Sequence, residues 1–477
     1  MTGIRCGMVV RGIATLAVIL HELQLLRLRT ESLLARILPG NSGRIRVLAT
    51  ACWSFPIYSQ TFVYQELTDL IRNRFRVRFI YCREDTRSNL PGQFLPLWRS
   101  RRRAIMTDEV CQRAYRYFQQ RYPETVGQLV ADICSASGMG ELELRRHHHF
   151  RQAFVFSQLA AAYGPDYLHS YFFYEGTLFA YVASMLLGIP RGVSCYADHM
   201  LQDYALKLVP LHLEQCRLVV ATSERIKGEL VALAPGTHHG KFVVKPNAIN
   251  GSSFPPVAPY DDPATGDPFR LVCVNRIEPK KGLVYLVEAL GILRGATPCP
   301  KLQIIGGADN DPGSRAYGDL LRQRIDELGL NDTVVLAGIQ TETAIKKIFS
   351  QSHIYVAPFV ETEYGDKDGI PTSLLEAMAS GLPVVATNAG SIGEVMEDGV
   401  HGIIVGQRDA AALAAALASL MANPEQRARF GNNGAKRIRE RFVVSVSEEA
   451  YRSRIRRLVD GGAPNPGNSE SGNLRHE

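Results

Sequence analysis

Two acidic residues eight positions apart, Asp368 and Glu376, carry the strongest chemical signal in this chain of 477 residues. They lie in the stretch DGIPTSLLEAMASGLPVVAT (368–387), where Asp368 stands in a glycine-containing loop and Glu376 falls within a predicted helix. Pro371 suits the first turn of that helix, where its missing N–H is not needed, and Gly381 suits the helix end. The apolar run that follows is typical of a buried parallel strand.

The start of this helix can meet an anion, because its first backbone N–H groups have no partner within the helix. Thr372 and Glu376 share one face of the helix, while Leu374, Leu375 and Met378 face the core. A carboxylate on the exposed face can bind the two hydroxyls of a ribose. The stretch therefore predicts a nucleotide-diphosphate site, formed by Glu376 and by the helix start, Gly369, Ile370, Pro371 and Thr372.

Fixed cations are the second requirement, because a departing diphosphate carries negative charge that a site without a metal must stabilise. Arg276 and Lys281 lie in VNRIEPKKGLVYLVEAL (274–290), where a predicted strand ends and a helix opens. This spacing presents two cations together at the end of a strand. We expect the adjacent Lys280 to point elsewhere.

These motifs together resemble those of the retaining glycosyltransferases of the GT-B fold, in the family of glycosyl transferases group 1. The family's signature is an acidic residue, seven further residues and then Glu, inside a G-x-P-x-x-x-x-E-A-x-A-x-G-x-P-V-V-A-T pattern, and Asp368 stands where Glu is commoner. The resemblance implies that Arg276 and Lys281 bind the donor phosphates. It also implies that Glu376 holds the ribose, that Asp368 contacts the donor sugar and that Gly306, at the end of a strand, lies in a loop near the nucleotide.

The first half of the chain offers candidates for the acceptor side. Ser59, Gln60 and Thr61 follow the first predicted strand and resemble the S-E-T-F-V element of exopolysaccharide-assembling members of the family. Ser59 or Thr61 is expected to cap the helix that follows. Near residue 196 the family often carries a His close to the reacting sugar, so either Tyr196 replaces that His or His199 supplies the imidazole.

The elements that must position these residues alternate between strand and helix. Buried strands separated by helices predict an α/β chain with two doubly wound parallel sheets, whose ligands bind at the carboxyl ends of the strands and so face one cleft. The predicted strands are 44–50, 76–82, 166–171, 192–197, 218–223 and 241–247, then 269–275, 301–307, 333–338, 353–359, 383–387 and 401–405.

The same alternation predicts domain boundaries. The predicted segments are a basic, partly helical extension (1–43), a Rossmann-like acceptor domain (44–254), a Pro- and Asp-rich linker (255–268), a Rossmann-like donor domain (269–440), a helix crossing back to the first domain (441–460) and a disordered tail (461–477).

Composition narrows the setting. The chain has nine Cys without a C-x-x-C pair, which favours a reducing compartment and indicates neither a zinc site nor a disulfide framework. No signal peptide is recognised, and the early apolar run 12–20 is too short to span a bilayer. A net charge of +7 is too diffuse to indicate nucleic acid. We expect a cytoplasmic protein that can bind the inner face of the cytoplasmic membrane, because Trp98 and the neighbouring arginines 99 and 101–103 suit an anionic lipid surface.

The resemblance implies a metal-independent enzyme that moves a sugar, with retention, from a nucleotide-diphosphate sugar to a carbohydrate or polyprenyl-linked acceptor in bacterial exopolysaccharide or cell-surface polysaccharide assembly. Two alternatives stay open. One is a nucleotide-sugar epimerase on the same fold, and the other is a non-catalytic nucleotide-sugar sensor or scaffold of a polysaccharide assembly complex. The donor base, the sugar and the acceptor do not follow from the sequence.

Overall fold

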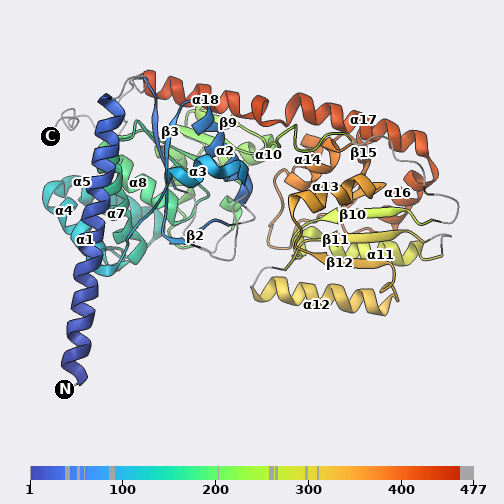
Figure 1. The fold of residues 1–477 in the computed structure, drawn as a ribbon, viewed down its shortest axis with the longest axis horizontal. Coiled ribbons are helices and arrows are strands. Elements are labelled where there is room, and N and C mark those ends of the chain that lie inside the picture. The colour runs from blue at the N-terminus through green and yellow to red at the C-terminus, as the bar shows by residue number, and fades with distance from the viewer. Residues whose placement is uncertain are drawn as a thin grey trace. The chain divides into compact units, whose positions relative to one another are not determined.

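The computed structural model describes residues 2–37, 43–50, 54–57, 60–84, 92–201, 204–256, 263, 267–295, 299–308 and 311–461. The chain divides into two compact units. Unit 1 comprises Met1–Ala221, Ile226–Lys245 and Glu448–Glu477, and unit 2 comprises Thr222–Arg225 and Pro246–Ser447. Each unit is built around a parallel sheet flanked by helices (Figure 1).

The sheet of unit 1 has seven strands in the order β5-β3-β1-β6-β7-β8-β9. Its strands are β1 (Arg46–Thr50), β3 (Arg76–Tyr81), β5 (Arg101–Arg103), β6 (Tyr167–Tyr171), β7 (Arg191–Cys195), β8 (Leu218–Ala221) and β9 (Phe242–Val244). Two further short strands, β2 (Ser54–Phe55) and β4 (Arg83–Glu84), pair with each other. The central strands are buried on both faces, which is why they read as continuous apolar runs.

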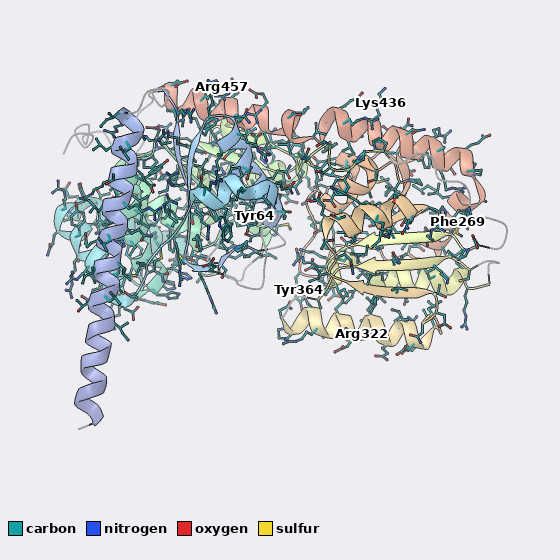
Figure 2. The ribbon with its side chains drawn as sticks, in the orientation of Figure 1. Tyr64, Phe269, Arg322, Tyr364, Lys436 and Arg457 are labelled. Atoms are coloured by element: carbon teal, nitrogen blue, oxygen red, sulfur yellow. The ribbon has the colours of Figure 1, made fainter. Side chains whose placement is uncertain are left out.

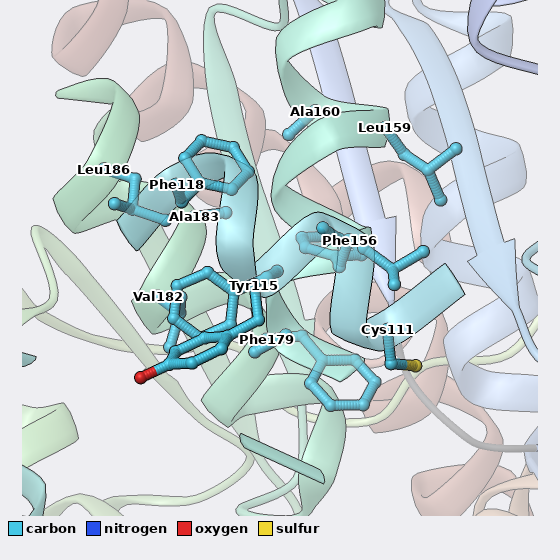
Figure 3. Close-up of a cluster of buried hydrophobic side chains, with 14 of the residues drawn as sticks. Cys111, Tyr115, Phe118, Phe156, Leu159, Ala160, Phe179, Val182, Ala183 and Leu186 are labelled. Carbon is cyan, nitrogen blue, oxygen red and sulfur yellow. The ribbon is translucent and has the colours of Figure 1, made fainter. Parts of the chain in front are cut away.

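Helices cover the sheet of unit 1, and several of them contribute side chains to its main core. Tyr115 and Phe118 of α4, Phe156 of α7 and Phe179 of α8 interleave in one buried cluster (Figure 3). The helices are α1 (Thr2–Ile37), α2 (Thr61–Arg72), α3 (Leu95–Ser100), α4 (Asp108–Arg121), α5 (Pro123–Ser137), α6 (Glu141–Arg146), α7 (His148–Tyr163), α8 (Glu175–Leu187), α9 (Val209–Gln215) and α10 (Glu224–Leu233).

The sheet of unit 2 has six parallel strands in the order β12-β11-β10-β13-β14-β15. Its strands are β10 (Arg270–Val274), β11 (Lys301–Ile305), β12 (Val334–Gly338), β13 (Ile354–Ala357), β14 (Val384–Thr387) and β15 (Gly402–Val405). Phe269, just before β10, and Tyr364, in the loop after β13, lie at opposite ends of this sheet (Figure 2). The carboxyl edge of the sheet is therefore the end marked by Tyr364.

Most helices of unit 2 lie between its strands in sequence, and α16 and α17 follow the last strand. The helices are α11 (Leu283–Leu293), α12 (Pro312–Glu327), α13 (Glu342–Gln351), α14 (Thr372–Ala379), α15 (Ile392–Val395), α16 (Ala410–Ala422) and α17 (Pro424–Arg441). The last helix, α18 (Val444–Asp460), begins in unit 2 and continues into unit 1.

All twelve strands predicted from the sequence are present, and the differences lie elsewhere. The arginine run at 101–103 forms the edge strand β5, which pairs with β3 on one side. The C-terminal helix is interrupted after Arg441, where Ile249 forms a bridge with Val443. This bridge ties residues near 249 to unit 2, so the unit boundary falls after Lys245 rather than after residue 254. The predicted tail lies outside the described residues, apart from Gly461.

A buried ion triad holds the returning helix α18 to unit 1. Lys245 Nζ lies 2.8 Å from Glu66 Oε2 and 3.0 Å from Glu448 Oε1, and all three side chains are buried. Burial alone would lower the pKa of Lys245, but Glu448 and Glu66 raise it well above its ordinary value. Burial raises the pKa of Glu448 to about 7, with Glu66 adding to the effect and Lys245 opposing it. The lysine is thus the charge that lets two carboxylates share one interior site.

We expect Lys245→Met to destabilise the protein by about 3–5 kcal/mol, because it leaves two buried carboxylates facing each other. Protonation of those carboxylates relieves the repulsion, so the deficit should shrink as the pH is lowered from 8 towards 5. Calorimetric melting of the wild type and the variant across this range measures both effects. The triple variant with Glu66→Gln and Glu448→Gln should recover part of the loss, and an equal deficit at every pH would contradict the account.

Candidate active site

The predicted donor-site residues of unit 2 gather at the point where the strand order of its sheet reverses. Strands β10 and β13 are neighbours, but the chain leaves β10 towards β11 and leaves β13 towards β14. Arg276 and Lys281 follow β10, while Asp368 and Glu376 follow β13. In open parallel sheets the segments after such a pair of strands diverge and leave a crevice in which ligands bind. The sequence spacing and the topology therefore indicate the same place.

Three glycines allow the loops at this edge to touch backbone to backbone. A Cβ on Gly282 would lie 1.9 Å from the carbonyl oxygen of Pro358, and a Cβ on Gly306 would lie 1.9 Å from that of Asn275. A Cβ on Gly390 would lie 2.2 Å from the carbonyl oxygen of Asp368. All three glycines also have positive φ, which other residues adopt at a cost. Gly306 thus sets the spacing between the loops after β10 and β11.

A lysine–aspartate pair joins the loops that follow β10 and β13. Lys281 Nζ donates to Asp368 Oδ2 at 2.5 Å and lies 4.8 Å from the centre of the Phe359 ring. Lys280 Nζ lies 3.2 Å from Asp366 Oδ1 and 4.0 Å from Asp368 Oδ1. The expectation that Lys280 points elsewhere is wrong, because its side chain turns to the same acidic loop as Lys281.

The neighbouring lysines Lys281 and Lys280 favour the ionised form of Asp368. Burial would raise the pKa of its carboxyl group, but Lys281 and Lys280 outweigh burial and hold that pKa below its ordinary value. Arg276 lies on the same loop as the lysines and places one guanidinium nitrogen 3.0 Å from Glu278 Oε1. Three cations, Arg276, Lys280 and Lys281, therefore lie beside three carboxylates, Glu278, Asp366 and Asp368, and their N–H groups are donors of the kind that bind phosphate.

Helix α14 carries Glu376 as predicted. Pro371 is its N-cap and Gly381, with positive φ, follows its last turn. Leu374, Leu375 and Met378 are buried, whereas Thr372 and Glu376 are half-buried on the opposite face. Tyr355 of β13 donates to Ser373 Oγ at 2.9 Å, which fixes the first turn of the helix against the sheet.

The pKa of Glu376 is shifted in the opposite direction from that of Asp368. Burial raises the pKa of its carboxyl group to about 8, with Glu342 of α13 adding to the effect and Lys346 opposing it. In the described part of the chain, no side chain or backbone group makes a hydrogen bond to this carboxyl group. The Glu376 carboxyl group is thus half-buried and turned away from the core. It lies on the helix whose start is formed by the segment Gly369 to Thr372.

Residues that the sequence did not single out hold the acidic loop in place. Arg225 donates to the carbonyl oxygen of Asp368 at 3.0 Å and to Ser391 Oγ at 3.1 Å. Glu394 accepts hydrogen bonds from the backbone N–H groups of Glu224 and Arg225. Asn247 donates to the carbonyl oxygen of Ile370 at 2.7 Å. All these contacts join segments far apart in sequence, so no local sequence pattern predicts them.

In unit 1, the acceptor-side candidates lie at the carboxyl edge of the other sheet. Gln60 is the N-cap of α2 but makes no capping hydrogen bond with its side chain, and its Oε1 is buried without a hydrogen-bond partner among the described residues. Thr61 begins the helix, so it is not the cap, and Ser59 lies outside the described residues. Tyr196 packs on Phe62 of α2, with ring centres 4.4 Å apart. The structure thus brings Tyr196 beside the segment that carries Gln60 and Thr61.

His199 is held by contacts within unit 1. Its Nδ1 lies 3.2 Å from Cys195 Sγ and its Nε2 lies 3.0 Å from Glu229 Oε2 of α10, and the side chain is buried. Both ring nitrogens are therefore engaged by the protein. The Tyr196 ring, by contrast, lies among the aromatic side chains Phe62 and Phe172 at the strand end.

The described residues hold no group of three His, Cys, Asp or Glu side chains placed to bind a metal ion. Over the same residues, no helix is both long enough and apolar enough to cross a bilayer.

Comparisons with known proteins place the segment that carries these residues within one family match. Residues 261–437 match the family model described as glycosyl transferases group 1. The amylovoran biosynthesis glycosyltransferase AmsK of Erwinia amylovora is 38% identical over 160 residues, which are 33% of this chain and 37% of that protein. The putative colanic acid biosynthesis glycosyltransferase WcaL of Escherichia coli is 25% identical over 375 residues, which are 76% of this chain and 88% of that protein.

Solved structures share the fold. Sucrose-phosphate synthase from Thermosynechococcus elongatus superimposes with a TM-score of 0.66 at 17% identity, covering 88% of this chain and all (100%) of that one. Anabaena HepE in complex with UDP gives a TM-score of 0.64 at 16% identity, covering 86% of this chain and 99% of that one.

The two parallel sheets and these neighbours define a GT-B protein, which confirms the fold class predicted from the sequence. Arg276, Lys281, Asp368 and Glu376 all lie within residues 261–437, the part of the chain that matches the family of glycosyl transferases group 1.

We expect Glu376→Gln to stabilise the protein above neutral pH. The pKa of Glu376 is about 8 when folded and about 4.3 when unfolded, so ionisation is disfavoured in the native state. The ionisation of Glu376 therefore costs the wild type stability as the pH rises from about 4.5 to about 8.5, and the variant lacks this contribution. Because the side chain is half-buried, we expect a gain of about 1–2 kcal/mol at pH 8.5 and little difference at pH 4.5.

Melting temperatures of both proteins across this pH range measure the effect. Glu440→Gln, at an exposed position of α17, is the matched control and should change neither value. A Glu376→Gln protein that melts below the wild type at pH 8.5 would show that the carboxylate is stabilised by contacts in the native state.

Proposed function

We propose that this chain is a retaining, metal-independent glycosyltransferase, which transfers a sugar from a nucleotide-diphosphate sugar to a carbohydrate or lipid-linked acceptor. The observation that carries the proposal is the convergence of Arg276, Lys280, Lys281, Asp368 and Glu376 at the reversal point of the sheet in unit 2. The match of the same segment to glycosyl transferases group 1 supports it.

The cations account for the leaving group. When the bond between the sugar and the diphosphate breaks, negative charge moves to the phosphate oxygens, and positive groups fixed nearby stabilise it more in the transition state than in the ground state. Lys281 and Arg276 are anchored by Asp368 and Glu278, so they are already oriented. In the proposed reaction these cations take the place that a divalent metal holds in other nucleotide-sugar sites.

In the proposed reaction, the two carboxylates bind the ribose and the sugar of the donor. The Glu376 carboxyl group makes no hydrogen bond to the protein among the described residues and would accept hydrogen bonds from the two ribose hydroxyls. Asp368, fixed next to Lys281, would contact the donor sugar. A donor phosphate oxygen would help to deprotonate the attacking hydroxyl on the same face, which leaves the configuration at the anomeric carbon unchanged. On the acceptor side we propose the segment Ser59–Gln60–Thr61, with either Tyr196 or His199 near the reacting sugar.

The names of the relatives AmsK and WcaL support a place in bacterial exopolysaccharide or cell-surface polysaccharide assembly. We propose that the protein works in the cytoplasm, where nucleotide sugars are made, beside the membrane that carries polyprenyl-linked acceptors.

The function itself is tested by a panel of UDP-, GDP- and ADP-sugars with carbohydrate and polyprenyl-phosphate acceptors. We expect one donor to release its nucleoside diphosphate when acceptor is added, with unchanged turnover in EDTA. Conversion of the sugar without acceptor would identify an epimerase instead. Binding of a donor without any turnover across the panel would favour the sensor or scaffold, and a strict requirement for added divalent metal would contradict the proposed mechanism.

In the same assay, Lys281→Ala should lower kcat by roughly 100-fold or more while changing the donor affinity much less, because charge on the leaving phosphate grows in the transition state. Lys301→Ala, exposed at the opposite end of the same sheet, is the matched control and should keep wild-type kinetics. Equal losses in kcat/KM and in donor affinity would show that Lys281 only holds the ground state.

A further inference from the structure

Helix α1 is apolar on two faces, and the described protein covers only one of them. Ala17, Val18, Leu25 and Leu28 are buried in the core that α4 and α7 build, and His21 lies 2.9 Å from Gln158 of α7. The opposite face carries large apolar side chains that are each between 45% and 66% exposed: Ile13, Leu16, Ile19, Leu20, Leu23, Leu26, Leu33, Leu34 and Ile37. An apolar helix face of this length in contact with water marks a surface for a partner.

The exposed face of α1 borders two adjoining grooves that run along the edge strand β5. One groove, of about 620 Å³, lies between Leu20 and Leu23 of α1 and the side chains of Trp98 and Arg99. The other, of about 640 Å³, lies between Leu16 of α1 and Met106. The two share Leu20, Arg103 and Ile105, so they form one continuous surface, which we call the α1–β5 groove. Figure 1 shows α1, in dark blue, passing along unit 1, with its N-terminal turns extending beyond the other elements.

The charged side chains that line the α1–β5 groove are all positive. Its lining includes five arginines and no carboxylate: Arg27, Arg99, Arg101, Arg102 and Arg103. Glu31, just outside the lining, accepts from Arg102 at 2.5 Å and also pairs with Arg27 and Arg78. Arg101 stacks over the Trp98 ring at 3.3 Å and lies 3.7 Å from Glu84. Arg99 and Arg103 are exposed and pair with no carboxylate in the described structure.

We propose that the exposed face of α1 and the arginine edge strand β5 together form a docking surface for an anionic phospholipid bilayer. The apolar row would enter the boundary between headgroups and acyl chains, where interfacial helices lie, and Trp98 would stand at the same level. Arg99 and Arg103 would meet the lipid phosphates while their stems stay against apolar surface. The site needs no membrane-spanning segment and does not depend on the proposed transfer reaction.

Charge also distinguishes a lipid surface from a second copy of the chain. A two-fold dimer uses the same patch on both subunits, so it would bring the arginines of the α1–β5 groove face to face. The lining offers no carboxylate to meet them. An anionic bilayer supplies the missing negative charge and an apolar phase in one partner.

The test is sedimentation of the full chain with vesicles of phosphatidylcholine alone or mixed with phosphatidylglycerol. We expect binding to the anionic vesicles at low ionic strength and weaker binding near 0.5 M salt. The double variant Arg99→Gln and Arg103→Gln should bind roughly 30-fold more weakly, since each arginine near such a surface contributes roughly five-fold. Arg102 is left unchanged because it is paired with Glu31.

A second double variant, Leu16→Gln and Leu23→Gln, removes the apolar contact without touching the charge, and it should also lose vesicle binding. Its helix should persist because both positions are exposed. Matched controls in unit 2 are Arg322→Gln with Arg439→Gln, and Leu320→Gln with Ile339→Gln, all at exposed positions. They make the same changes in charge and polarity and should bind as the wild type does.

Equal sedimentation with neutral and anionic vesicles would overturn the proposal, and so would equal losses in the control variants. Analytical ultracentrifugation without lipid decides about the second copy. If the wild type is a dimer that Leu16→Gln and Leu23→Gln convert to a monomer, while binding to vesicles is unchanged, the face belongs to a dimer interface and the proposal fails. Because the readout is binding, an inactive but vesicle-bound protein would sink the proposed transfer reaction and leave this surface standing.

Discussion

The ion pair between Lys281 and Asp368 is the interaction on which the candidate donor site depends. The two side chains come from loops that follow different strands, and both are nearly enclosed. Either charge alone would be costly at that depth, so removing one destabilises the position of the other. The pair forms only because Gly282 and Gly390 let the surrounding backbones close to distances at which a Cβ would overlap a carbonyl oxygen. The close backbone approach that the glycines allow and the attraction between the two charges thus act together. The same close approach of the loops positions the neighbouring Arg276 and Lys280.

The fold can be predicted from the sequence where burial on both faces of a strand requires a continuous run of apolar residues. The central strands of both sheets are buried on two faces, so each appears as a short apolar run and all were predicted. Strand β5 was not, because Arg101–Arg103 is held by backbone pairing to β3 alone, and an edge strand tolerates charges that discourage pairing with other chains. The predicted boundary between residues 440 and 441 lies next to the interruption between α17 and α18. The interruption coincides with the bridge between Ile249 and Val443, a contact that spans nearly two hundred positions and leaves no local mark.

The site was predictable to a similar depth. Asp368, Glu376, Arg276 and Lys281 belong to two motifs whose spacing the strand–loop–helix units preserve, so their convergence was predictable. The direction of Lys280 was not, because it depends on Asp366 arriving from a different loop. Arg225 and Glu394, which join residues 222–225 to the rest of unit 2, are likewise visible only in three dimensions. His199 shows the converse case. Its position at a strand end was right, but contacts with Cys195 and Glu229 engage both ring nitrogens.

The two carboxylates of the signature differ in charge at neutral pH, and this difference has a consequence for donor binding. Asp368 is surrounded by cations and stays ionised, whereas Glu376, with a pKa of about 8, carries its proton over most of the neutral range. Under the proposed function, a ribose diol donates two hydrogen bonds and so favours the ionised form of Glu376. Binding the donor would then release the proton, and the free energy of that release is drawn from the binding energy. Under the proposed function, the half-buried position of Glu376 thus couples donor affinity to pH, while Asp368, already ionised and held by Lys281, contributes no such coupling.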